Sequence, residues 1–172
     1  NGDKVLVNAD GTVSVVQEIL DPAGAGSSST FASNRNINSS GSAFDSNSNK
    51  VVICYADSAN SSHGTAVVGT VSGSTITFGS PVVFNSGYTA HNSTVFDSSS
   101  NKVVVFFTNG ANSNYGTAVV GTISGTSISF GSAAIFNTAN SDTPRTVFDS
   151  NSNKIVLTYK DFANSYVGTA IV

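Results

Sequence analysis

The sequence has few charged residues and lacks tryptophan and methionine altogether. Of its 172 residues, 10% are Asp, Glu, Lys or Arg, and Glu18 is the one glutamate. This excludes a charged helical protein, and the abundant Ser, Thr, Asn and Gly favour short strands joined by turns. Because 39% of the residues are hydrophobic and gather in short β-branched runs, we expect one folded domain rather than a disordered chain.

The charge and the hydropathy exclude two further classes of protein. A net charge of −3 with seven scattered basic residues leaves no basic stripe for nucleic acid. No apolar run approaches the ~18 residues of a membrane span, and no signal peptide is recognisable. Cys54 is the single cysteine, and Phe106 and Thr158 take its place in the later repeats described below. We therefore expect Cys54 to be a small buried apolar side chain.

A repeat of 52 residues organises the chain. Residues 44–79 return as residues 96–131 with 23 of 36 positions identical and no gap, and the pattern starts a third time at Phe148. A period of about 50 residues indicates an array of similar supersecondary units. We therefore divide the chain into an N-terminal hairpin at 1–20, a linker at 21–41 and repeats at 42–172.

Each unit divides into four predicted strands. The first is short, SAF or TVF, and precedes a polar turn, DSNSN or DSSSN. The second is KVVICY, KVVVFF or KIVLTY, the third begins GTAVV or GTAIV, and the fourth is TITF or SISF. The fourth continues past a glycine, which predicts a bulge or bend. Upstream, KVLVN and TVSVV flank Asp10-Gly11, which predicts a hairpin, and 22–40 is expected to be loop with Thr30 and Phe31 as a strand remnant.

Four antiparallel strands every ~50 residues, apolar on both faces, predict the blade of a β-propeller. The alternatives are a β-solenoid or a row of sandwich domains, and a sandwich fits the short period poorly. About three blades do not close a ring, because propellers have at least four. We expect closure either by a homo-oligomer, with the N-terminal hairpin completing the last blade and two chains forming six blades, or within a longer repeat chain.

The units FDSNSNKVVICY…GTAVVGTVSG and FDSSSNKVVVFF…GTAVVGTISG resemble repeats in large structural proteins of marine bacteriophages. The opening GDKVLVNADGTVSVV is similar to short β segments of phage fibre proteins. The resemblance covers most of the chain. It implies a part of a virion surface or tail fibre, hence an extracellular location and contact with a host surface.

The turn DSNSN has oxygen side chains at alternate positions, Asp45, Asn47 and Asn49, as a calcium loop does at its start. It lacks the glycine and the bidentate glutamate of such a loop. A hairpin turn in which the aspartate accepts backbone N–H groups is therefore favoured, and calcium stays a weak alternative.

Catalysis is not expected, and no cofactor is implied. The nucleophile-elbow pattern GxSxG is absent, and a sialidase would need more arginines than Arg35 and Arg145. A glycosidase-like propeller enzyme is the second alternative to the function favoured below.

The connections that differ between units are expected at one end of the sheets. Alternate connections of a four-stranded meander share an end, so the variable second–third loops and the inter-blade loops, at 85–93 and 137–145, lie together, opposite the constant turns. This predicts a non-enzymatic scaffold whose loops bind a host-surface glycan or receptor. The alternative is a purely structural component, whose long loops vary in sequence without having a function. The candidate ligand-binding residues have aromatic, imidazole or guanidinium groups: Arg35, His63, Tyr88, His91, Tyr115, Arg145, Phe162 and Tyr166.

Overall fold

The computed structural model describes residues 4–7, 10, 13–16, 26–33 and 37–172. Within them the chain is all-β, apart from two three-residue 3-10 helices, η1 (Ser58–Asn60) and η2 (Gly110–Asn112). The predicted hairpin is confirmed, because β1 (Lys4–Val7) pairs antiparallel with β2 (Val13–Val16). These two strands form a sheet of their own. The remaining strands build one open antiparallel sheet of eleven strands.

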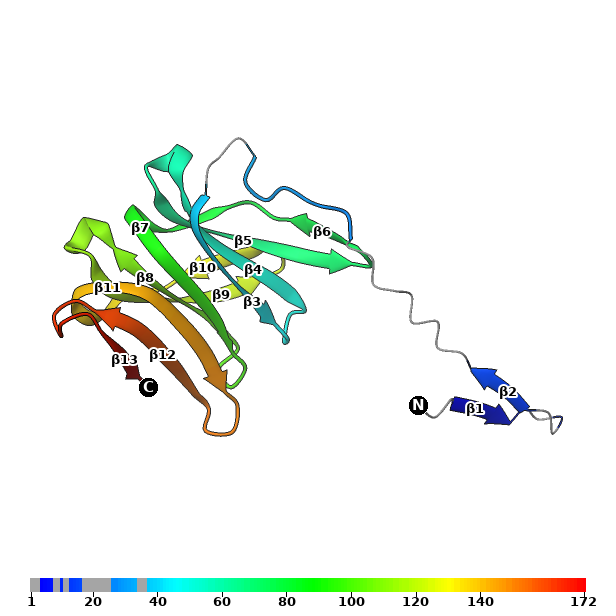
Figure 1. The fold of residues 1–172 in the computed structure, drawn as a ribbon. Helices are drawn as coiled ribbons and strands as arrows, with labels where there is room; N and C mark the ends of the chain where they lie inside the picture. The colour runs from blue at the N-terminus through cyan, green and yellow to red at the C-terminus, as the bar shows by residue number, and fades with distance from the viewer. Residues whose placement is uncertain (1–3, 8–9, 11–12, 17–25, 34–36) are drawn as a thin grey trace.

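The large sheet follows the order β13-β12-β11-β9-β8-β7-β5-β4-β3, with β6 added to β5 and β10 added to β9 (Figure 1). Its strands are β3 (Ile37–Asp45), β4 (Lys50–Asp57), β5 (His63–Ser72), β6 (Thr75–Phe78), β7 (Val82–Asp97), β8 (Lys102–Asn109), β9 (Tyr115–Ser124), β10 (Ser127–Phe130), β11 (Ala134–Asp149), β12 (Lys154–Asp161) and β13 (Val167–Ile171).

Two long strands divide this sheet into three repeating units. Residues 82–88 of β7 pair with β5, whereas residues 89–97 of β7 pair with β8. The strand β11 changes partner in the same way, from β9 to β12. Unit 1 is therefore β3–β6 with 82–88, unit 2 is 89–97 with β8–β10 and 134–140, and unit 3 is 141–149 with β12 and β13.

The predicted second, third and fourth strands are confirmed, and so is the interruption at the glycine. β6 ends at Phe78, and β7 begins at Val82 beyond Gly79. Both segments pair with the same strand, β5, and between them the Gly79 amide donates to the Val68 carbonyl over 2.9 Å. The fourth strand of a unit thus consists of two pieces separated by a bend.

Two predictions about connections are wrong. The first strand of each unit is longer than SAF or TVF, and β3 begins at Ile37 inside the segment expected to be loop. The predicted inter-blade loops, 85–93 and 137–145, lie within β7 and β11. Strand pairing continues through these polar residues, first with the preceding unit and then with the next, and Tyr88 lies opposite His63 on β5. Within these two segments the backbone is left-handed only at His91 and Thr143. Bulges at 90–93 and 142–145 absorb the change of partner.

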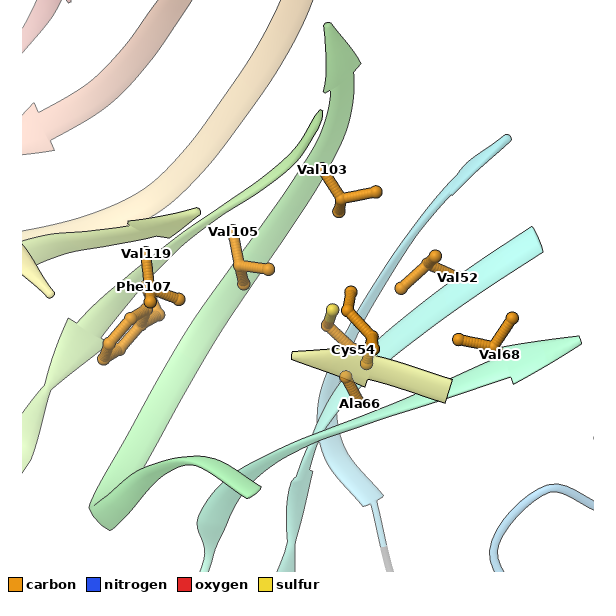
Figure 2. Packing of buried hydrophobic residues seen from close by; sticks show 9 residues of the cluster. Val52, Cys54, Ala66, Val68, Val103, Val105, Phe107 and Val119 are labelled. Atoms are coloured by element: carbon orange, nitrogen blue, oxygen red, sulfur yellow. The ribbon is translucent and has the colours of Figure 1, made fainter. Parts of the chain in front are cut away.

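The units pack face to face. Val52 and Cys54 of β4 bury their side chains against Val103 and Val105 of β8, with Phe107 completing the cluster (Figure 2). A second cluster joins the other face of unit 2 to unit 3. Unit 2 therefore buries an apolar face on each side, since alternate residues of β8 enter different clusters. The second cluster is formed by Val95, Val104, Phe106, Leu157 and Tyr159.

The first strands of the three units lie side by side along one surface of the stack (Figure 1). Hydroxyl and amide groups join them: the Asn92 backbone amide donates to Ser39 Oγ over 2.7 Å, and Ser93 Oγ lies 2.9 Å from Thr146 Oγ1. Between units, then, apolar side chains meet along the second and third strands, and polar side chains meet along the first. The two ends of the sheet, β3 and β13, stay apart, so the closed ring remains a prediction.

Candidate functional site

The connections after the second strands form a recurrent structure at one end of the units. β4, β8 and β12 each end in a carboxylate or an amide, and Asp57 Oδ1 accepts the Ala59 backbone amide over 3.1 Å. Left-handed residues then reverse the chain before the next strand begins. These positive-φ residues are Ser61, Ser62, Ser113, Asn114, Ser165 and Tyr166. We call this end, with the midpoints of β7 and β11, the variable end.

A polar network holds the variable end in a fixed shape. Asn85 Nδ2 donates to Thr89 Oγ1 over 2.8 Å and lies 3.4 Å from Asn109 Oδ1. The same arrangement recurs 52 residues later, where Asn137 Nδ2 donates to Ser141 Oγ and to Asp161 Oδ1. Because buried polar groups that find partners restrict the backbone, side chains displayed above this network have defined positions.

Two predicted candidates, His63 and Tyr88, meet at the edge of unit 1, where they are register partners. The Tyr88 ring covers Gly110 at the start of η2, so it spans from unit 1 to unit 2. Tyr88 is still 53% exposed. A ring that packs against Gly110 and is otherwise exposed offers a flat apolar surface to solvent.

A second aromatic group lies at the variable end of unit 3. The rings of Phe162 and Tyr166 pack edge to face with centroids 4.8 Å apart. Lys160 Nζ lies 5.0 Å from the Phe162 centroid and 5.2 Å from the Tyr166 centroid. Tyr166 is 61% exposed and has φ 64°, in the left-handed region that bulky residues avoid. We call Lys160, Phe162 and Tyr166 the aromatic triad.

The other candidates are dispersed. His91 occupies the bulge of β7, and its Nε2 lies 2.9 Å from Asp142 Oδ1 of β11. Tyr115 starts β9, half-buried between its partners Asn109 and Asn140. Arg145 is exposed opposite Thr158 on β12 and donates to the Pro144 carbonyl over 2.8 Å. Arg35 lies outside the described residues.

Lys160 and Asp142 were not among the predicted candidates. A comparison of the units contains the signal for Lys160, because Ala56 and Thr108 occupy its position in units 1 and 2. Asp142 differs in the same way from Ala90, its counterpart in unit 2. Its contact with His91 had no signal in the sequence, since it depends on two bulges.

The opposite, constant end contains the DSNSN turns. Asp45 Oδ1 accepts the backbone amides of Asn47 and Ser48 over 2.8 and 3.1 Å, and Oδ2 accepts Ser48 Oγ over 2.6 Å. Asn49 ends the turn at φ 56°. This is the geometry of the hairpin turn favoured from the sequence, with both carboxylate oxygens engaged by protein donors.

Among the described residues, no three His, Cys, Asp or Glu side chains gather closely enough to bind a metal ion. In the same part of the chain, neither 3-10 helix has the length or apolarity to cross a membrane.

The fold and the variable end define a class: an all-β protein of stacked 52-residue antiparallel units that displays aromatic side chains from one end. The chain matches no protein-family model, no curated protein and no solved structure. Its function must therefore be argued from its own residues.

Proposed function

We propose that the chain is a non-enzymatic, propeller-type module that binds a glycan of a host surface through its variable end. The aromatic triad is the observation that supports the proposal. Tyr166 occupies a left-handed position where unit 1 has Ser62 and unit 2 has Asn114, and asparagine tolerates that backbone better than tyrosine does. A bulky, exposed aromatic residue in this strained conformation favours a role for the ring itself.

The chemistry of the triad suits a sugar. Flat rings pack against the C–H face of a pyranose, and the Lys160 ammonium supplies three N–H donors to hydroxyl groups beside them. Tyr88 offers a similar surface at unit 1, above the Asn85 network. Several weak sites on one rigid scaffold bind a repetitive surface more strongly than any one of them. A place on a virion surface or tail fibre, as the resemblance implies, would supply that setting.

The test is a glycan array or host-cell adsorption assay on the purified protein. Replacing Tyr88, Tyr115 and Tyr166 together by alanine should abolish binding and leave the fold intact by circular dichroism. The control is Asp97→Ala in a constant turn, which should bind like the parent protein. Unchanged binding by the triple variant, or no binding by the parent, would favour the structural component instead.

A further inference from the structure

Phe84 and its counterparts occupy a two-sided socket between neighbouring units. On one side the ring packs edge to face on Phe107, with centroids 5.2 Å apart, and lies 5.5 Å from Phe130. On the other side it covers Gly64, where any Cβ would overlap the ring. Phe136 repeats the arrangement between Gly116 and Tyr159. A complete socket therefore needs a glycine from the third strand of one unit and an aromatic residue from the next.

Phe31 occupies one half of the same socket. Its ring packs edge to face on Tyr55 and Phe78, with centroids 5.3 and 5.9 Å away. Tyr55 and Phe78 precede Phe107 and Phe130 by 52 positions. The segment 26–33 also shares with 79–86 the spacing of Gly, Ser and Phe, as Gly26, Ser27 and Phe31. It therefore lies on unit 1 in the way the end of a fourth strand would lie if another unit preceded it.

Gly168 is the third-strand glycine of a socket that has no phenylalanine over it. It follows Gly64 and Gly116 by multiples of 52 residues, yet both of those are buried under a phenylalanine. Gly168 is exposed, and a Cβ there would meet no atom within 4 Å. It lies on β13, and no described strand pairs with the edge of β13 that faces away from β12.

Apolar residues of units 1 and 3 are exposed at positions whose counterparts are buried between units. Val147 on unit 3 is 60% exposed, whereas Val95 at the same repeat position is 8% exposed in the cluster between units 2 and 3. Phe44 on unit 1 is 55% exposed, whereas Phe96 and Phe148 pack against the clusters between units. Unit 3 thus exposes the kind of face that a following unit covers, and unit 1 exposes part of the kind that a preceding unit covers.

We infer that unit 3 of one copy docks against unit 1 of a second copy, and that the segment 26–33 of the second copy completes unit 3 as its fourth strand. Within the chain, this interface joins unit 1 to unit 2 and unit 2 to unit 3. The same interface then joins unit 3 of each copy to unit 1 of the next copy. This inference rests on the proposed propeller-type stacking and not on glycan binding. The two open faces are different, so the contact is head-to-tail, and such contacts close into rings when the rotation allows. Two copies of three units fall within the four to eight blades of known propellers.

The repeat predicts the register of the new strand pair. Thr65 pairs with Val83 and Ala66 with Val82 in unit 1. At the corresponding positions, Thr169 of one copy should pair with Thr30 of the other, and Ala170 with Ser29. The added strand satisfies the free backbone groups of β13, which is how β-strand addition gains affinity.

The first test is the mass of the full chain in solution by light scattering across a range of concentrations. Two copies of the 17.5 kDa chain are expected, and a larger closed species would equally support docking. The variant Gly168→Ala should dissociate the assembly, with at least a tenfold rise in its dissociation constant, because its Cβ meets Phe31 of the second copy. Val147→Lys should do the same by placing a charge in the contact. A parent protein that is monomeric throughout overturns the inference.

A second test reads the register directly. Thr30→Cys combined with Thr169→Cys should give disulfide-linked dimers on mild oxidation, whereas Thr30→Cys combined with Ser99→Cys, at the constant end, should not. Absence of a cross-link in the first pair, with normal circular dichroism, would contradict the proposed strand addition. The glycan assay tests the variable end separately. If the parent protein forms the dimer but binds no glycan, the proposed function is wrong and the docking inference stands.

Discussion

The ring of Phe84 fills the space that a side chain on Gly64 would occupy. The pair joins the third strand of unit 1 to the segment that closes the same unit, and Gly116 and Phe136 repeat it in unit 2. The glycine is needed here for close packing rather than for a special backbone angle, since neither glycine has a positive φ.

Gly64→Ala and Gly116→Ala should each destabilise the protein by roughly 1–3 kcal/mol, the usual cost of overpacking a core. Urea unfolding followed by circular dichroism measures the change. Gly131→Ala is the matched control, because the nearest atom to its Cβ would be the Val120 carbonyl oxygen at 3.9 Å. Equal effects of Gly64→Ala and Gly131→Ala would show that the aromatic contact is not what requires glycine.

The Cys54 thiol should be inert in the folded protein. Burial raises the pKa of Cys54 to about 12, against a smaller opposing effect of the Thr94 hydroxyl, so almost no thiolate exists near neutral pH. An aromatic disulfide reagent should label Cys54 only as urea unfolds the chain. A Cys54→Ala, Ser99→Cys variant supplies the exposed comparison and should react at once. Native labelling of Cys54 at a similar rate would contradict the buried placement.

The constant turns should make stability depend on pH in the acid range. Partial burial would raise the pKa of Asp97, but hydrogen bonds from Ser99 and Ser100 outweigh it and lower that pKa. The pKa of Asp149 is lowered by the Ser152 hydroxyl and by the backbone amides of Asn151 and Ser152. A carboxylate with a depressed folded-state pKa stabilises the fold above its unfolded pKa, near 3.8, and this stabilisation is lost as pH falls through the folded value.

Carboxyl titration by NMR checks this directly, and both aspartates should titrate below their ordinary value. Ser100→Ala removes one donor and should raise the pKa of Asp97 while leaving that of Asp149 unchanged. An ordinary pKa for Asp97 in the parent protein would show that the turn hydrogen bonds do not persist in solution.

Calcium should not stabilise the protein through the DSNSN turns. The oxygens of Asp45 already accept two backbone amides and a hydroxyl, so a cation would compete with those hydrogen bonds for the carboxylate. The melting temperature should therefore be the same in millimolar calcium and in excess chelator, since no ligand linkage acts on the folded state. Asp45→Asn serves as the comparison. A calcium-dependent rise that Asp45→Asn removes would establish a site at this turn.

The repeat predicted most of the strands, because alternating β-branched residues and glycine turns act locally. It did not predict that residues 85–93 lie within a strand, since that strand depends on pairing with two different units. The role of Phe31 was missed for a similar reason. One extra residue separates Phe31 from Phe44, compared with Phe84 and Phe96, and hides the repeat from an ungapped comparison. Among the candidate residues, the contact between Phe162 and Tyr166 requires a left-handed tyrosine that no propensity favours.

Tyr166→Asn should separate ligand binding from stability. Asparagine tolerates the left-handed backbone that Tyr166 adopts at φ 64°, and Asn114 already occupies this position in unit 2. Relief of about 1 kcal/mol of backbone strain offsets the loss of an aromatic contact of similar size, so the free energy of unfolding should change by less than about 1 kcal/mol. Tyr166→Ala loses the contact without that relief and should be less stable than Tyr166→Asn by about 1 kcal/mol. Both variants lack the ring and should lose glycan binding at unit 3 to the same extent. If Tyr166→Asn binds as strongly as the parent protein, the aromatic triad is not the binding surface.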